Sequence, residues 1–455
     1  MLASHDTEPR PLPSRPHAVA LVRGAIDPAA DRSAPGAHAG AEARPPVGGS
    51  RRGLPSGLRG AGVLVLGDHR QSLTVARSLH RAGYHVIAGR PGRRTILERS
   101  RCVAAAWDHP PLSQPGAWAE ALETFCAEHQ EIGVVFPVGD AEIDLTAPLA
   151  TRLPVPVVVA APATLAVCRS KRALLALAAD AGVPTQAWEA VDFPGALAPA
   201  LRRVGAPAAL KPDLQAEDVV GFKATIVRSE ADAQRLADRT PFPTCGFVLQ
   251  RLARGPRHNV YFVAREGRLL GHAEVRILRT DRPDGTGLAV EGESVAPSPA
   301  LLAWTRALAA HLSYTGAGCA QFVVDDAAAS ACFLEINARL GANCAAVCAC
   351  NLDLPRLFVE AILGVAEEQP PAEIGRRYAW LDGDLYGLAR ALGSGSVRWT
   401  AAPAWLARAA AAQLRAHDHI TWSWRDPLPT VAIFGRLLRA VLGLIRRWLF
   451  PRRNA

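Results

Sequence analysis

Four polar side chains between residues 319 and 339 have the types and spacing of a metal and phosphate site. Glu335, Asn337 and Arg339 follow one another at intervals of two residues, and Gln321 lies in the preceding apolar run. Side chains alternate between the faces of a strand, so a hairpin over 319–339 puts these groups on one face. Carboxylate and amide oxygens suit Mg²⁺, and an arginine beside them suits a phosphate or a developing negative charge. The alternative is a solvated polar face of a sheet.

Lysine is rare in this chain and is confined to one stretch. Of the 51 basic residues, only Lys171, Lys211 and Lys223 are lysines. A compact ammonium on a flexible stem suits a nucleotide phosphate, where arginine is not equivalent. We therefore interpret the three lysines as phosphate ligands. A genome bias towards arginine combined with an accidental cluster is the alternative.

The positive charge lies at the two ends of the chain. The net charge is +9, with eight arginines and five acids in 1–60 and six arginines and no acid in 431–455. These ends contribute +3 and +6, which leaves 61–430 neutral. A neutral body is a poor nucleic-acid platform, so we expect an enzyme with a charged tail and no nucleic-acid partner.

The cysteines indicate a reducing compartment. There are nine of them, an odd number, and we find no signal peptide, so we expect a cytoplasmic protein. Cys344, Cys348 and Cys350 have the look of a metal cluster. They lie in an alanine-rich helical run without histidine, which favours small core residues instead.

The front of the chain reads as a disordered segment followed by a Rossmann-like domain. Residues 1–58 are rich in Pro, Gly, Ala and Arg and have no apolar periodicity. Over 60–163, a strand at 62–68, a helix at 71–83 and a strand at 84–89 form a parallel unit. The turn after the first strand reads G-D-H-R-Q-S, with one glycine rather than three, which disfavours a dinucleotide-binding oxidoreductase.

Behind this domain we expect an α+β body at 164–365 and a small appended region at 366–430. A hairpin at 259–278 turns at the Glu-Gly pair. Residues 431–455 read as a basic amphipathic helix, and its arginines argue against a membrane span. Contact with a membrane surface, contact with a partner protein and docking on its own domain all remain open.

The hairpin carries a resemblance to a known family. The runs Q-F-V-V at 321–324 and F-L-E-I-N-A-R-L-G at 333–341 resemble the metal-binding hairpin of ATP-grasp enzymes, especially one synthetase unit of the carbamoyl-phosphate synthetase large chain. The order of the parts over 60–365 is similar too. The resemblance implies an α/β fold: a Rossmann-like pre-ATP-grasp domain, an α+β ATP-grasp body and a small C-terminal helical appendage.

The resemblance also implies a role for each matching residue. By this resemblance the ligands of Mg²⁺ or Mn²⁺ are Gln321, Glu335 and Asn337, and the ligands of the ATP phosphates are Lys171, Lys211 and Lys223. Adenine is contacted by the strand at Gln250, Arg251 and Leu252, and the ribose by His258. The transferred phosphate or acyl group is bound by Arg276 and Arg339. Two features depart from the family: the loop 213–222 has a single glycine, and a histidine stands at 258 where an acid is usual.

The implied activity is that of an ATP-dependent carboxylate–amine ligase. A carboxylate becomes an acylphosphate, and an amine-type nucleophile then displaces phosphate. We expect Asp140 and Glu142 to bind the amine or to begin a helix, and 279–295 to line the acceptor site or to form a loop. An inactive relative that binds nucleotide as a scaffold is the alternative function, and a homodimer is left open.

Overall fold

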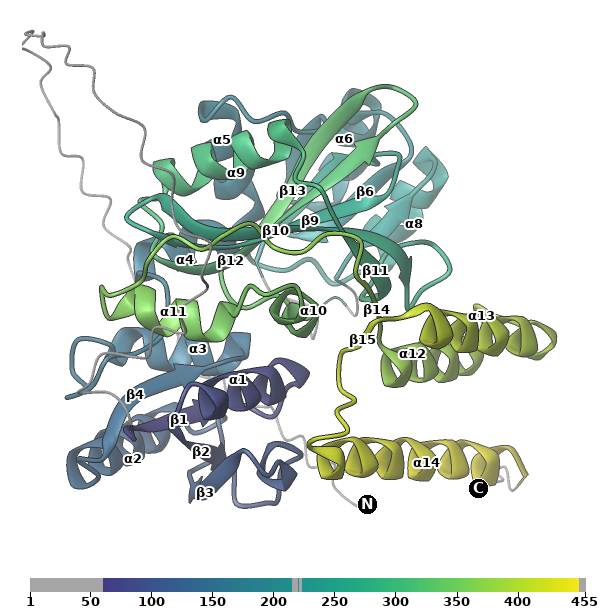
Figure 1. The fold of residues 1–455 in the computed structure, drawn as a ribbon. Helices are drawn as coiled ribbons and strands as arrows, with labels where there is room; N and C mark the ends of the chain where they lie inside the picture. Colours follow the sequence, from purple (N-terminus) through teal and green to yellow (C-terminus); the bar gives the residue numbers. More distant parts are fainter. Residues whose placement is uncertain (1–59, 215–219, 221–222, 450–455) are drawn as a thin grey trace, which may run out of the picture. The chain divides into compact units, whose positions relative to one another are not determined.

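The computed structural model describes residues 60–214, 220 and 223–449, with side chains as far as Arg439. The predicted disordered segment 1–58 and most of the loop 213–222 lie outside these residues. The described part is built on three sheets and their helices (Figure 1).

The first sheet is parallel, with four strands in the order β3-β2-β1-β4. Its strands are β1 (Gly62–Leu66), β2 (His85–Arg90), β3 (Val103–Asp108) and β4 (Ile132–Pro137). The helices of this domain are α1 (Arg70–Arg81), α2 (Pro115–Glu128) and α3 (Asp140–Thr146), with a short 3-10 helix η1 (Leu97–Arg99). The predicted Rossmann-like unit is present. The apolar run 156–160 contributes to this sheet only a single bridge, between Val135 and Val157.

Two helices, α4 (Pro162–Arg169) and α5 (Lys171–Asp180), lead to a small antiparallel sheet with the order β5-β8-β6-β7. Its strands are β5 (Trp188–Val191), β6 (Ala208–Pro212), β7 (Thr225–Val227) and β8 (Phe247–Arg251). Helices α6 (Leu197–Val204) and α8 (Glu230–Arg239) pack against this sheet. Leu201, Leu210 and Phe247 belong to its own hydrophobic core.

The third sheet has seven strands in the order β13-β12-β9-β10-β11-β14-β15. They are β9 (Arg257–Arg265), β10 (Arg268–Thr280), β11 (Ala289–Val295), β12 (Gly316–Asp325), β13 (Ser330–Asn337), β14 (Arg377–Ala379) and β15 (Asp418–His419). The β9–β10 hairpin turns at Glu266 and Gly267, both with positive φ, as the Glu-Gly pair predicts. Helices α9 (Pro299–His311), α10 (Cys344–Ala349) and α11 (Leu354–Ile362) accompany this sheet.

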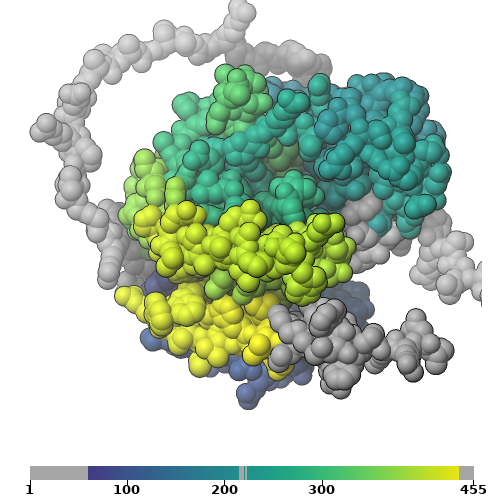
Figure 2. All heavy atoms as spheres, turned by 90° about the vertical axis from the view of Figure 1, so that its right-hand side faces the viewer, coloured from purple at the N-terminus to yellow at the C-terminus, as the bar shows by residue number. Residues whose placement is uncertain are grey.

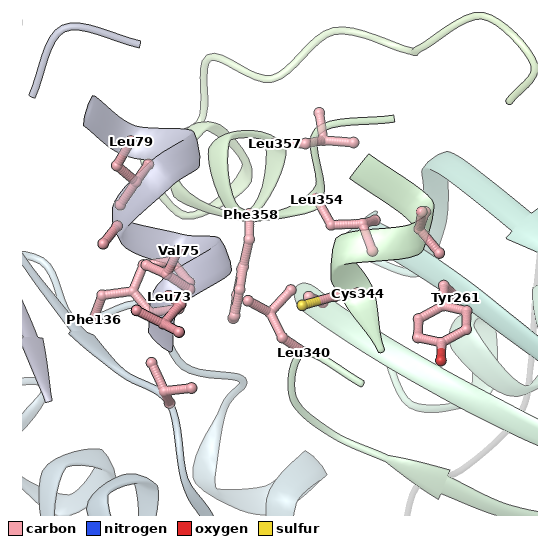
Figure 3. Packing of buried hydrophobic residues seen from close by; sticks show 14 of the residues in the cluster. Leu73, Val75, Leu79, Phe136, Tyr261, Leu340, Cys344, Leu354, Leu357 and Phe358 are labelled. Carbon is pink, nitrogen blue, oxygen red and sulfur yellow. The ribbon is translucent and has the colours of Figure 1, made fainter. Parts of the chain in front are cut away.

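One large core joins the first sheet to one face of the seven-stranded sheet. Leu73 and Leu79 from α1, Phe136 from β4 and Phe358 from α11 pack together in it, with Tyr261 beyond (Figure 3). The rings of Phe136 and Phe358 meet edge to face, with centroids 5.6 Å apart. Side chains of the opposite face, including Phe262 and Phe322, belong to a second core.

The region 366–430 differs from the expected helical appendage. It contains helices α12 (Leu381–Gly393) and α13 (Ala402–Arg415), but β14 and β15 also extend the seven-stranded sheet. Apolar alternation cannot reveal strands of three and two residues, because the pattern needs at least four.

The C-terminal helix α14 (Pro427–Leu449) begins earlier than the pattern predicts and docks on the described chain through one side. Leu437 is buried, Ile433 packs against the large core, and Arg436 lies 3.7 Å from Asp68. Leu428, Val431 and Leu438 stay exposed. Figure 2 shows the helix on the surface beside α12 and α13. No helix among the described residues is long and apolar enough to cross a bilayer.

Candidate active site

The polar hairpin forms with Gln321, Glu335 and Asn337 arranged as the spacing predicts, whereas Arg339 lies beyond β13, which ends at Asn337. Gln321 on β12 is the direct cross-strand partner of Glu335 on β13, so both side chains leave the sheet on the same face. Asn337 joins them, because its Nδ2 donates to Glu335 Oε1 at 3.1 Å. The Asn337 nitrogen is thereby oriented, and three oxygen-bearing groups share one patch. Such a donor set fits Mg²⁺ or Mn²⁺, with phosphate oxygens needed to complete the shell.

Lys211 reaches this region from the small sheet. Its Nζ donates to Gln250 Oε1 at 3.2 Å. Burial lowers the pKa of Lys211; Glu335 opposes the change, while Lys171 reinforces it. The structure thus brings Lys171, Lys211 and Glu335 close enough to influence one another. A partly buried ammonium near a second cation favours an anion at this point.

Lys171 is held at the start of α5 by Asp213. Ser170 caps the helix, its Oγ accepting from the Ala173 amide at 3.1 Å. The Lys171 Nζ donates to the Asp213 carbonyl at 3.1 Å, and the Arg172 amide donates to the Asp213 carboxylate at 2.9 Å. The beginning of α5 and the end of β6 are therefore tied together, which positions two of the three lysines. The placement of Lys223 beside phosphate stays a prediction.

In the strand expected to contact adenine, two backbone amides already donate hydrogen bonds within the chain. The Arg251 N–H donates to the Ala187 carbonyl at 2.8 Å, and the Leu252 N–H donates to the Pro207 carbonyl at 2.9 Å. The Gln250 side chain is buried, and its Nε2 has no hydrogen-bond partner among the residues that the structure describes. Adenine contact through this strand therefore requires other groups than these two amides, or an exchange of partners.

His258 and Arg276 do not join the hairpin's polar face. Asn259 is the cross-strand partner of Gln321, so His258, its neighbour along β9, points to the opposite face. His258 Nδ1 lies 2.6 Å from Glu274 Oε1, and Glu274 Oε2 accepts from the Ser298 amide at 2.7 Å. Arg276 pairs in register with His258 and forms an ion pair with Glu293. The expected ribose and acyl roles of these two residues are not supported by this register.

The same register reveals two polar residues that the sequence did not single out. Arg257 and Asn259 lie on the face of Gln321. Each has a buried atom with no hydrogen-bond partner in the described part of the chain, namely Arg257 Nε and Asn259 Oδ1, although Arg257 Nη1 and Nη2 donate to the Gly287 carbonyl. Because side chains alternate along a strand, Arg257 and Asn259 are expected on the same face. Their common face with Gln321 follows only from the pairing of β9 with β12, which the sequence does not supply.

The loop after β13 meets the first sheet at Arg339. Its Nε donates to Asp140 Oδ1 at 2.7 Å. Burial works against the charged form, but Asp140 outweighs it and raises the pKa of Arg339. Asp140 begins α3 and Arg339 is its partner, so both expected roles, helix start and site residue, remain compatible with its position.

Glu142 pairs with His69 rather than standing free. His69 Nε2 lies 3.3 Å from Glu142 Oε2, and this contact raises the pKa of His69. Gly139 allows the approach, because a Cβ there would lie 2.1 Å from His69 Nε2. A role for Glu142 in binding the amine stays a prediction.

Two other expected features have structural roles. The segment 279–295 is not a loop between strand and helix, since it holds the end of β10 and all of β11. Arg279 in it bonds both Glu291 and Asp384, which fixes α12 to the sheet. Cys344 is buried in the large core, and burial raises its pKa to about 12. Among the described residues, no group of three His, Cys, Asp or Glu side chains could hold a metal.

Comparison with known proteins gives a clear result for the fold. Neither family models nor curated proteins match the chain. Solved structures do match. An N5-carboxyaminoimidazole ribonucleotide synthetase superposes with a TM-score of 0.56 at 14% identity, covering 70% of this chain and 81% of its own. The biotin carboxylase of Campylobacter jejuni gives 0.56 at 16% identity, covering 71% and 75%. The fold is that of ATP-grasp enzymes.

An L-amino acid ligase from Bacillus licheniformis is a further match, with a TM-score of 0.54 at 14% identity, covering 70% of this chain and 79% of its own. The α/β fold class is therefore confirmed. At such identities the likeness concerns the fold alone. These neighbours do not single out carbamoyl-phosphate synthetase, so that closer likeness stays a prediction.

Proposed function

We propose that this chain is an ATP-dependent carboxylate–amine ligase. The observation that carries the proposal is the pairing of Gln321 with Glu335, extended by Asn337, on the face that Lys211 approaches. Structural neighbours with the same fold were solved with ADP, and one with magnesium ADP and bicarbonate, which supports nucleotide and metal as ligands. Fold alone does not decide activity, so the argument depends on these residues.

The residues divide into two groups. Gln321, Glu335 and Asn337 would hold Mg²⁺ or Mn²⁺, which when bound screens phosphate charge and orients the phosphates. Lys171 and Lys211 would bind the phosphate oxygens, with Lys223 as a third cation. Gln250 positions the Lys211 ammonium through the 3.2 Å hydrogen bond. Arg339, oriented by Asp140, would stabilise negative charge on the transferred group.

The reaction balances without a covalent enzyme intermediate. A carboxylate oxygen of the substrate attacks the γ-phosphorus of ATP, the bond to the bridging oxygen breaks, and ADP leaves. An amine nitrogen then attacks the acyl carbon. The carbon–oxygen bond to phosphate breaks, inorganic phosphate leaves, and the nitrogen loses its proton to solvent. The lysines and Arg339 act by neutralising charge in both steps.

Two observations favour the alternative, an inactive relative that binds nucleotide as a scaffold. The metal set has a single carboxylate, Glu335, and the Arg251 and Leu252 amides are already paired within the chain. This alternative predicts nucleotide binding without turnover, so one assay separates the two functions.

The test is phosphate release from Mg-ATP by the full chain. Pools of small carboxylic acids and amino acids would be added with and without pools of amines, beside Glu335→Ala as a control. Release that needs an added acid and is lost in Glu335→Ala supports the ligase. Binding of ATP without release from any pool supports the scaffold. Failure to bind ATP contradicts both.

The exposed side of α14 supports a second proposal, contact with an anionic membrane surface. Leu428, Val431 and Leu438 lie on one side of the helix and are 62%, 65% and 59% exposed, and Trp424 nearby is 82% exposed. The segment 431–455 adds six arginines and no acid. We expect the chain to sediment with vesicles containing phosphatidylserine, and a Val431→Gln, Leu438→Gln variant to remain in the supernatant. Equal sedimentation of both proteins would contradict the proposal.

A further inference from the structure

Beside the metal-binding hairpin lies a group of polar side chains that the proposed chemistry leaves unused. It comprises Arg70, Arg257, Asn259, Asn343 and Tyr378. They come from α1, β9, the loop after β13 and β14, so distant parts of the sequence build it. Its continuity with the hairpin follows from the register, in which Asn259 is the cross-strand partner of Gln321.

Arg70 is a cation in a mostly buried position. Its guanidinium carbon lies 3.6 Å from the centre of the Trp380 ring, and its Nε donates to the Ala342 carbonyl at 2.8 Å. Burial lowers the pKa of Arg70 to about 10, against smaller opposing effects led by Asp382. Within the described part of the chain, no carboxylate lies within 4.0 Å of this guanidinium. Asp382 instead accepts from Trp380 Nε1 and Thr421 Oγ1.

Tyr378 connects Arg70 with the other members. Asn343 Nδ2 donates to the Tyr378 hydroxyl at 3.0 Å and to the Ala289 carbonyl at the same distance. Arg257 and Arg70 both act on this hydroxyl: burial raises the pKa of Tyr378 to about 12, while Asn343 and the two guanidinium groups oppose the rise. Arg257 Nη1 and Nη2 donate to the carbonyl of Gly287, two residues before Ala289, at 3.2 Å, and Arg70 bonds Ala342, the residue before Asn343. Both cations therefore lie near Asn343.

Buried polar atoms without partners point to a ligand. Asn343 is 2% exposed and Asn259 is 6% exposed, and among the described residues neither Oδ1 has a hydrogen-bond partner, nor has Arg257 Nε. Leaving a buried acceptor unsatisfied is energetically costly, so such atoms are normally paired. Two guanidinium groups suit a carboxylate, and two amide oxygens suit an ammonium.

We infer that this group binds an α-amino acid, with its carboxylate on Arg70 and Arg257 and its amino group at the Oδ1 atoms of Asn259 and Asn343. The inference rests on the proposed ligase function and names its amine component. A carboxylate held by arginine is kept from the phosphates, and the amino group then lies beside Gln321, the side on which an acylphosphate would form. Aromatic rings of Trp380 and Tyr378 border the group.

The experiment is equilibrium binding by calorimetry to the full chain with Mg²⁺ and a non-hydrolysable ATP analogue. The probes are a pool of L-amino acids and a pool of the matching decarboxylated amines. We expect heat of binding from the amino acids and none from the amines. Equal binding of both pools, or binding of neither, overturns the inference.

The variant Arg70→Lys keeps the positive charge and loses the paired donors. We expect its affinity for the best amino acid to fall at least about tenfold, with unchanged affinity for the ATP analogue. Arg81→Lys, an exposed arginine on the same helix, is the matched control and should bind as wild type. If the Arg70→Lys protein does not fold, amino-acid affinity is measured instead with Asn343→Asp, which adds a negative charge near Arg70. Unchanged amino-acid affinity in a folded Arg70→Lys or Asn343→Asp protein contradicts the assignment.

The result that would contradict the ligase proposal differs from the result that would contradict amino-acid binding. It appears as absence of ATP binding or of acid-dependent phosphate release, whatever the amino acids do. Amino-acid binding is measured without turnover, so the two results are independent.

Discussion

Arg339 Nε and Asp140 Oδ1 lie 2.7 Å apart, joining the loop after the β12–β13 hairpin to the first turn of α3. The arginine thereby has a fixed direction before any substrate arrives. The contact also links residues 199 positions apart in the sequence, so the site depends on the docking of the Rossmann-like domain on the seven-stranded sheet.

Removing the charge of Asp140 should loosen this junction. We expect Asp140→Asn to lower the free energy of unfolding by about 1–2 kcal/mol, because the pair is only partly buried and a fully buried pair would cost more. Urea denaturation measures the change. Asp180→Asn, at an exposed position on α5, is the control, and an equal effect of both substitutions would argue against a special role for the pair.

We expect Lys211 to lower the free energy of unfolding and to strengthen ATP binding. We expect Lys211→Met to weaken ATP binding at least about tenfold while leaving the free energy of unfolding at pH 7 unchanged or higher. The reason is that burial disfavours the ammonium in the folded chain. Arg203→Met on the exposed side of α6 serves as control and should leave ATP affinity unaltered. A Lys211→Met protein that binds ATP normally would remove Lys211 from the site.

The lowered pKa of Lys211 also predicts a pH dependence. Between its folded pKa and the ordinary 10.5, the unfolded chain binds more protons than the folded chain, so this group makes stability rise with pH in that interval. Below the folded pKa, Lys211 is charged in both states, so the full cost of burying its ammonium is present. Phosphate binding favours the ammonium, so ATP should bind with proton uptake in the same interval. Calorimetry in two buffers of different ionisation enthalpy measures it, and uptake should disappear in Lys211→Met.

The two faces of the seven-stranded sheet should respond differently to substitution. We expect His258→Ala to destabilise the chain by about 2 kcal/mol, because it leaves Oε1 of the buried Glu274 without its His258 partner, and to leave ATP affinity unchanged. Gln321→Ala should instead weaken Mg²⁺-dependent ATP binding. Loss of ATP affinity in a folded His258→Ala protein would show that His258 contacts the nucleotide after all.

Adjacent leucines on α14 test how the helix is docked. Leu437 is 5% exposed and Leu438 is 59% exposed. We expect Leu437→Ala to lower the free energy of unfolding by about 2–3 kcal/mol and Leu438→Ala to change it by less than about 0.5 kcal/mol. Thermal or urea unfolding measures both, and equal effects would mean that the helix is not held by this side.

The sequence predicts the arrangement of the hairpin side chains Gln321, Glu335 and Asn337 because their geometry is local. Glu335 and Asn337 share a face through strand alternation, and Gln321 joins them across one turn. The face on which His258 lies depends instead on how β9 pairs with β12, which the sequence does not supply. The sequence also does not single out Arg70, because it lies on α1, some 190 residues before Arg257. The arrangement of the hairpin side chains depends on local geometry, whereas the positions of His258 and Arg70 depend on long-range contacts, which no local pattern encodes.

The most direct test of the central claim is the Mg²⁺ dependence of ATP binding in wild type and Glu335→Gln. The account predicts that Mg²⁺ strengthens ATP binding by the wild-type chain, and that Glu335→Gln loses most of this gain while Glu266→Gln, on the exposed hairpin turn, keeps it. Equal Mg²⁺ dependence in all three proteins would contradict the assignment of Gln321, Glu335 and Asn337 as the metal site.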